Sequence, residues 1–150
     1  MPSMPRLLLR LFLLAALAAV ILLPRAHDLD TFLTADEKQW AANTGNFLRR
    51  LSFGEWDLLL QLPHPGVTTQ WIGAPTIFSA SWAVKKLPLA LAGSLLIGAV
   101  AYVFARLWGR RSAFLLALLL ALNPVRVAHT RVYAMDALLA LFVLLSLGLF

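Results

Sequence analysis

Long apolar runs alternate with shorter polar stretches along the chain. The first apolar run covers 7–24 and the second covers 87–106, while a shorter third run covers 112–125 and a fourth extends from about 133 to 150. A helix needs about 20 predominantly apolar residues to cross the hydrocarbon core of a bilayer. The pattern therefore predicts an all-α integral membrane protein with three to four transmembrane helices at these positions.

Two of these runs allow a second interpretation. A basic start before the first run also fits a secretory signal peptide, but Pro24 to Asp28 is a poor match to a cleavage site, so we predict an uncleaved first span. The third run is short enough to be a re-entrant or buried segment. Its leucine-rich composition and its basic start at Arg110 and Arg111 favour a short span.

The loop at about 25–86, between the first two spans, differs in composition from the rest of the chain. It holds six of the seven acidic residues and four of the five tryptophans. Thr34 and Glu37 have the spacing of a capping box, which predicts an amphipathic helix from there to about Leu51, lying on the bilayer surface. Gly54 is expected to end that helix, and a loop of this length is usually functional.

Composition supports the membrane class. Of the 150 residues, 61% are hydrophobic and 13% are charged, whereas soluble domains carry roughly 45–50% and about 25%. The net charge of +6 comes from short basic clusters at the ends of the apolar runs, where lipid headgroups would lie, so we expect a lipid bilayer and no nucleic acid as partner. The chain has no cysteine, which excludes a thiolate nucleophile and a disulfide framework.

Ionisable residues beside membrane spans are costly and are therefore candidates for function. Asp36 and Glu37 form a carboxylate pair at a predicted helix start, where mutual repulsion could tune one of them for general-base catalysis. The alternative is that both complement the helix dipole. Arg131 presents planar donors that suit a phosphate, with Asp136 to orient it; otherwise Arg131 reaches for headgroups and Asp136 compensates a helix dipole.

A turn and a set of tryptophans complete the candidates. His64 lies between two prolines, either as an exposed turn residue or as a donor to a phosphate or a sugar hydroxyl. The loop tryptophans suit an interfacial aromatic belt or, alternatively, a platform for stacking sugars. They are Trp40, Trp56, Trp71 and Trp82. No cluster of residues has metal-ligand spacing, so we predict no metal site.

The order of these features resembles the membrane glycosyltransferases of the GT-C type. This group includes the protein O-mannosyltransferases and the bacterial aminoarabinose and RgtA/B/C/D-like transferases, also described as glycosyltransferase family 39. The matching features are, in order, Asp36-Glu37 after the first span, the His64-Pro65 turn, the basic turn at 105–111, Asn123-Pro124, and Arg131 with Asp136. Gly66 departs from the family, which more often has proline at that position.

The resemblance implies a mechanism. The long loop would be extracytoplasmic at the plasma membrane, the donor a polyprenyl- or dolichyl-phosphate sugar, and the acceptor an unidentified hydroxyl compound. Asp36 would be the general base, beside Glu37, in an inverting transfer, and His64, Arg131 and Asp136 would bind the donor phosphate. A divalent cation as cofactor is left open. The resemblance covers 1–150 as the N-terminal portion of a longer enzyme; the alternative is a non-enzymatic small multi-span membrane protein, either a transporter piece or an assembly factor.

Overall fold

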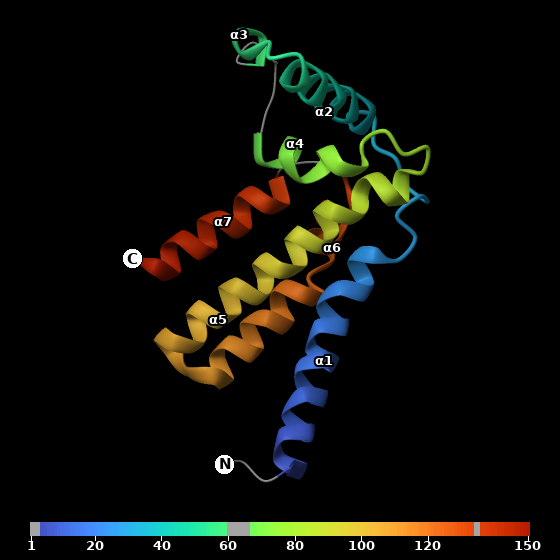
Figure 1. The fold of residues 1–150 in the computed structure, drawn as a ribbon. Helices are drawn as coiled ribbons and strands as arrows, with labels where there is room; N and C mark the ends of the chain where they lie inside the picture. Colours follow the sequence, from blue (N-terminus) through green and yellow to red (C-terminus); the bar gives the residue numbers. More distant parts are fainter. Residues whose placement is uncertain (1–3, 60–66, 134–135) are drawn as a thin grey trace.

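The fold is helical throughout the described part of the chain. A computed structural model describes residues 4–59, 67–133 and 136–150, and Figure 1 shows its elements. They are α1 (Met4–Ala26), α2 (Glu37–Ser52), α3 (Trp56–Leu59), α4 (Val67–Gly73), the 3-10 helix η1 (Ala74–Thr76), α5 (Trp82–Leu122), α6 (Pro124–Arg131) and α7 (Asp136–Leu149). The all-α prediction is confirmed for these residues, which contain no strand.

Helix α5 is a hairpin of two antiparallel arms, which we call the first arm (82–108) and the second arm (110–122). Gly109 separates them with φ 83° and ψ 165°, a backbone conformation that glycine adopts without a steric penalty. Figure 1 shows the second arm running back beside the first. The second and third apolar runs therefore form two successive helices, as predicted.

The lower layer of the molecule is a bundle of α1, the α5 hairpin and α7 (Figure 1). Its core is apolar and is shared by all three elements: Ile21, Ile97, Val100, Leu120, Ala121 and Leu141. By length and composition, α1 and α5 could each cross a membrane. Most of α1 is not covered by the rest of the chain, because Ile21 and Arg25 are its only buried residues among those described.

The upper layer consists of α2, α3, α4 and η1, which lie across one end of the bundle (Figure 1). A second core joins the two layers around Ile77, Leu89, Tyr133 and Leu138. Phe47 of α2 is 5% exposed and meets the ring of Trp71 edge-on at a centroid distance of 5.1 Å.

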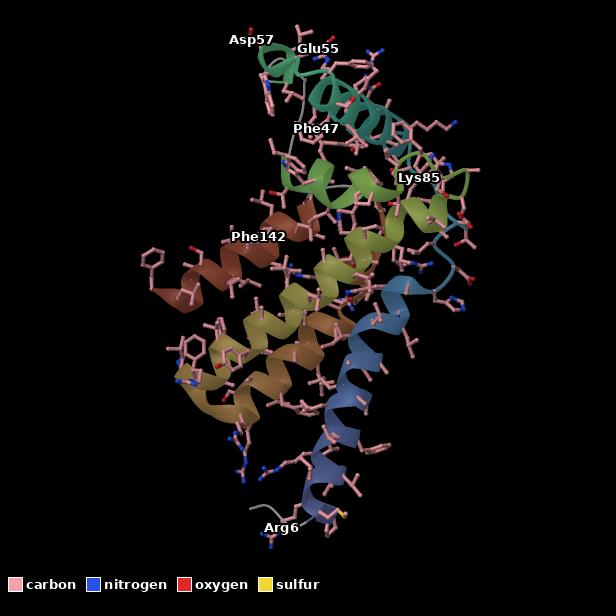
Figure 2. All side chains as sticks on the ribbon, in the orientation of Figure 1. Arg6, Phe47, Glu55, Asp57, Lys85 and Phe142 are labelled. Carbon is pink, nitrogen blue, oxygen red and sulfur yellow. The ribbon has the colours of Figure 1, made fainter. Side chains whose placement is uncertain are left out.

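The predicted amphipathic helix is present, but its apolar side faces protein. Trp40, Ala41 and Leu48 pack against the second core, and Phe47 points toward α4, as Figure 2 shows. The expectation that this side lies on the bilayer surface is therefore wrong. An amphipathic pattern reports that one face is buried; it does not distinguish lipid from protein as the covering material.

The ends of α2 follow local signals. The helix begins at Glu37 with Asp36 as its N-cap residue. Half of the predicted capping box is present, since the Thr34 N–H donates to Glu37 Oε2 at 2.7 Å. At the other end Gly54 has φ 70°, and the Glu55 N–H donates back to the Arg50 carbonyl at 2.9 Å. This is the Schellman arrangement, so Gly54 ends the helix as predicted.

The third predicted run extends too far, because the helix ends at Leu122 and not at Val125. The Asn123 side chain accepts the Arg126 N–H at 3.0 Å, and Pro124 follows in the first turn of a new helix. Both residues are standard helix-start signals. The stretch between the third and fourth predicted runs therefore belongs to helix α6, Pro124–Arg131.

Candidate functional site

A buried polar cluster joins the loop, the bundle and the segment before α7. We call it the junction; its buried members are Glu37, Lys86 and Tyr133, and the backbone of Phe32 and Thr34, which are less buried, completes it. Glu37 is 0% exposed and Lys86 is 1% exposed. Glu37 Oε1 lies 3.0 Å from Lys86 Nζ and accepts the Tyr133 N–H at 2.6 Å, while Lys86 Nζ donates to the Phe32 carbonyl at 2.6 Å. Together with the bond from Thr34, these contacts occupy both carboxylate oxygens of Glu37.

The junction changes the interpretation of Glu37. Sequence analysis paired it with Asp36 at the catalytic position. A carboxylate that is enclosed, ion-paired and bonded to two backbone N–H groups is held in one place and is not presented to a substrate. Glu37 therefore ties the start of α2 to the first arm of α5 and to the segment before α7.

Tyr133 extends the junction toward α4. Its side chain is fully buried, and its hydroxyl donates to Thr44 Oγ1 at 2.9 Å. A Cβ placed on Gly73 would come within 1.9 Å of the Tyr133 hydroxyl oxygen, so the tyrosine ring needs a glycine on α4. Burial raises the pKa of Tyr133 above its usual value of 10.0, and the hydrogen bond with Thr44 offsets part of that rise.

Asp36 has an environment unlike that of its neighbour. It is exposed, and although it is the N-cap residue of α2, its side chain makes no capping hydrogen bond. The next residue, Glu37, contacts Tyr133, which lies between Arg131 and Asp136 in the chain. The structure thus brings the segments carrying Asp36, Arg131 and Asp136 to the same end of the bundle. The sequence interpretation also predicts that the Asp36 side chain lies close to Arg131 or Asp136, and this stays a prediction.

Helix α6 separates two cavities. The first, which we call the α6–α7 cavity, has a volume of about 270 Å³. Its lining residues are Val125, Arg126, His129, Asp136, Ala137 and Ala140. The second, which we call the loop cavity, has a volume of about 250 Å³. Its lining residues are Asp28, Leu29, Thr31, Phe32, Ala128, Arg131 and Val132.

Arg131 and Asp136 therefore belong to different cavities. The Arg131 guanidinium donates to the Asp28 carbonyl at 2.9 Å in the loop cavity, whereas Asp136 lines the α6–α7 cavity with Arg126 and His129. Asp136 was expected to orient Arg131, and the cavity linings do not support that pairing. Instead, they place Asp136 with one arginine and one histidine of α6.

Arg126 is a cationic group with unused hydrogen-bonding capacity. Its Nη1 atom is buried and has no hydrogen-bond partner among the described residues, and the same holds for Nε of Arg25. The two guanidinium groups are close enough to repel each other electrostatically. Buried donors without partners are rare in proteins, and two neighbouring cations in that state favour a bound anion.

Arg25 has a second role at the end of the α5 hairpin. Its guanidinium donates to the carbonyls of Leu120 and Ala121 at 2.9 and 3.1 Å, and to the Ile21 carbonyl at 2.6 Å. The last carbonyls of a helix lack partners within that helix, and a cation is stabilising there. Arg25 of α1 thus caps the second arm of α5 in space, although it is distant in sequence.

The structure gives few contacts for the remaining predicted candidates. His64 lies in 60–66, outside the described residues. In the described part, no group of three or more histidine, aspartate or glutamate side chains is arranged to hold a metal ion. Trp56 and Trp71 are exposed, and Lys85 Nζ lies 4.6 Å from the ring centre of Trp82. Either interpretation of the tryptophans, as an aromatic belt or as a sugar platform, is compatible with this placement.

Sequence analysis missed Lys86, Tyr133 and Arg25, and it noted Arg126 beside Arg131 as a candidate without giving it a role. Lys86 was assigned to a basic flank of the second span, and Arg25 to the end of the first. The signal for Arg126 was present, because Asn123-Pro124 starts a helix that places residues 126 and 129 on one face. No local pattern points to Tyr133.

Comparison of the chain with protein-family models, with curated proteins and with solved structures found no match in any of the three. Any functional conclusion therefore depends on the residues and their geometry.

Proposed function

We propose that this chain forms part of a membrane glycosyltransferase of the GT-C type, which transfers a sugar from a polyprenyl- or dolichyl-phosphate carrier to an extracytoplasmic acceptor at the plasma membrane. The observation that carries the proposal is the α6–α7 cavity. Its lining includes His129, Asp136 and Arg126, whose Nη1 has no hydrogen-bond partner among the described residues. The exposed carboxylate of Asp36 lies at the same end of the bundle.

Membrane insertion is supported by the surface of α1. Leu8, Phe12 and Leu14 are 61%, 69% and 63% exposed, and their neighbours are exposed as well. Soluble proteins rarely present so large a contiguous apolar surface to water. With 23 residues, α1 is about 35 Å long at 1.5 Å per residue, which is enough to cross a hydrocarbon core of about 30 Å.

The orientation of the bundle in the membrane is supported by two basic segments that lie at the same end of it. Arg6 of α1 and the turn of the α5 hairpin lie at the end of the bundle away from α2 and α3 (Figures 1 and 2). Basic residues in short connections favour the cytoplasmic side. The loop that contains Asp36 would then be extracytoplasmic, where lipid-phosphate sugars serve as donors.

The proposed chemistry is an inverting displacement at the anomeric carbon. The acceptor oxygen forms a bond to that carbon while the bond from the carbon to the carrier phosphate oxygen breaks. Asp36 takes the acceptor proton, and the carrier phosphate leaves with its negative charge beside Arg126. A guanidinium suits this role because its planar donors match phosphate oxygens. Arg131, in the neighbouring cavity, would add positive potential, with its geometry set by Asp28.

The base role is tested by Asp36→Asn in the full-length protein expressed from its complete open reading frame and purified in detergent. Transfer is measured with radiolabelled polyprenyl-phosphate mannose and polyprenyl-phosphate aminoarabinose as donors. Loss of a general base lowers the rate by about 10²- to 10⁴-fold. The matched control is Asp57→Asn, which removes an exposed carboxylate from α3 and should leave transfer unchanged. Equal rates for the two variants would refute the base role.

The phosphate role is tested by Arg126→Gln. A hydrogen bond to a charged group is worth about 1.5–3 kcal/mol, so KM for the donor should rise by about 10- to 150-fold. Arg49→Gln, which removes an exposed charge from α2, is the control. An unchanged KM in Arg126→Gln would remove this residue from the donor site. Absence of transfer by the unmodified protein with any lipid-phosphate sugar would instead favour a non-enzymatic multi-span protein.

A further inference from the structure

The end of the bundle away from α2 and α3 carries positive charge without acidic partners. We call it the basic end; its members are Arg6, Arg10, Arg106, Arg110 and Arg111, and all are exposed. The seven acidic residues of the chain all lie between 28 and 57 or at Asp136. Figure 2 shows Arg6 at one extreme of the molecule and Glu55 with Asp57 at the other. The basic end therefore has no carboxylate to neutralise it.

Arg110 and Arg111 are free to meet a ligand. Neither has a hydrogen bond or an ion pair with a described residue, whereas Arg106 is held by the Tyr102 hydroxyl at 3.5 Å. Both arginines follow the turn at Gly109 and are exposed, and Arg110 lines a groove between α1 and the two arms of α5.

An apolar groove runs from the basic end into the bundle. It has a volume of about 430 Å³ and lies between α1 and both arms of α5. Leu14, Ala105 and Arg110 line the part near the basic end, and Ile21, Gly98 and Ala117 line the part farther from it. Seven residues of helix separate Gly98 from Ala105, which corresponds to about 10 Å along the axis. A Cβ added to Gly98 would meet nothing within 4 Å, so the groove is open there.

We propose that this groove binds an anionic phospholipid, with one acyl chain along the groove and the phosphate of its headgroup on Arg110 and Arg111. Charge complementarity selects the occupant: an apolar channel that ends on unpaired arginines matches a molecule with an apolar tail and an anionic head. Basic pockets between membrane helices bind anionic headgroups in this way. The proposal rests on the membrane insertion proposed above and is independent of glycosyl transfer.

The test compares two lipids that share acyl chains and differ in charge. Full-length protein in detergent is titrated with dioleoyl phosphatidylglycerol or dioleoyl phosphatidylcholine, and bound lipid is counted by native mass spectrometry while Tm is measured in parallel. We expect phosphatidylglycerol to bind with defined stoichiometry and to raise Tm, and phosphatidylcholine to do neither at the same concentration. Inorganic phosphate should not displace bound phosphatidylglycerol, because it lacks the acyl chain.

Two variants locate the site. Arg110→Gln with Arg111→Gln should weaken binding of phosphatidylglycerol by about 10- to 30-fold, at about 1 kcal/mol for each basic residue. Lys38→Gln with Arg49→Gln, which removes two exposed charges from α2, should leave binding unchanged. Gly98→Phe adds a side chain where the structure is open and should block the acyl chain without unfolding the protein.

The outcomes separate this proposal from its competitors. Equal binding of the two lipids, or equal loss in the two charge-removal variants, would overturn it. Unchanged phosphatidylglycerol binding in Gly98→Phe, accompanied by a change in oligomeric state, would mean that the groove docks a helix and not a lipid. Release of the protein from membranes by alkaline carbonate would refute insertion itself, whereas lipid binding without transferase activity would refute only the enzymatic proposal.

Discussion

The ion pair between Glu37 and Lys86 should be the main electrostatic tie between the upper layer and the bundle. The substitution Lys86→Met keeps the length of the side chain and removes its charge. Glu37 then retains the N–H donors of Thr34 and Tyr133 but loses its counter-charge, and the Phe32 carbonyl loses its donor. Removing one partner of a buried pair costs about 3–5 kcal/mol.

The two remaining N–H donors place the expected value near the lower limit, at about 3 kcal/mol, which corresponds to about a hundredfold change in an equilibrium constant. Hydrogen exchange of the full-length protein, read by mass spectrometry for peptides from α2, measures it. Amides of Glu37–Ser52 should exchange about a hundredfold faster in Lys86→Met, because α2 detaches more often. The core of the α5 hairpin should change less, since its contacts with α1 and α7 do not involve Lys86.

Lys38 provides the matched control. It follows Glu37 in α2 and is exposed, so Lys38→Met also removes one positive charge and should change stability by no more than about 0.5 kcal/mol. Combining Lys86→Met with Glu37→Gln removes the uncompensated charge, so the double variant should be more stable than Lys86→Met alone. Equal exchange in Lys86→Met and Lys38→Met, or a double variant that shows the sum of the two single effects, would refute the reasoning.

Three further predictions concern packing, protonation and helix capping. Gly73→Ala should destabilise the protein by about 1–3 kcal/mol, because the new Cβ meets the Tyr133 hydroxyl at 1.9 Å. Gly98→Ala should stabilise it by up to about 1 kcal/mol, since nothing lies within 4 Å of the new Cβ. Thermal unfolding followed by tryptophan fluorescence measures both, and equal Tm values for the two variants would contradict the packing. Tyr133→Phe should lower the free energy of unfolding by about 0.5–1.5 kcal/mol at pH 9. This difference from the unmodified protein should shrink above pH 10, because the raised pKa of Tyr133 means that the unfolded chain loses the proton first and the unmodified protein loses stability there. A difference that does not vary with pH would count against burial of the hydroxyl. Asn123→Ala should lower the free energy of unfolding by about 0.5–2 kcal/mol, because it removes the cap of α6. Faster amide exchange should be confined to Pro124–Arg131. Unchanged exchange in this segment would show that the cap is dispensable.

Elements with local signals could be predicted from the sequence. The apolar runs mark α1, both arms of α5 and α7, and the carboxylate three residues after Thr34 marks the start of α2. Gly54 ends α2 because a residue in the left-handed conformation is needed there, and a glycine at that position in the sequence predicts it. The predicted end of the third run at Val125 was wrong because it followed hydrophobicity. The capping signal of Asn123-Pro124, which ends one helix and starts the next, is the stronger guide.

The site was less predictable because its contacts join residues that are distant in the chain. Glu37 was recognised as a charged residue at a helix start, but its partners come from the first arm of α5 and from the segment before α7. Nothing near Glu37 in the sequence distinguishes a carboxylate that contacts Lys86 from one that contacts a substrate. Similarly, Arg131 and Asp136 are close in sequence, and only the path of α6 places them in separate cavities.

The second arm of α5 depends on α1 for its completion. That arm is about 20 Å long at 1.5 Å per residue, and its last carbonyls have no partner within the helix. Each unsatisfied carbonyl in hydrocarbon costs several kcal/mol, and Arg25 supplies the donors for Leu120 and Ala121. Since α1 is synthesised first, the donor is in place before the hairpin that needs it emerges. We therefore expect the α5 hairpin to close on an α1 that is already present.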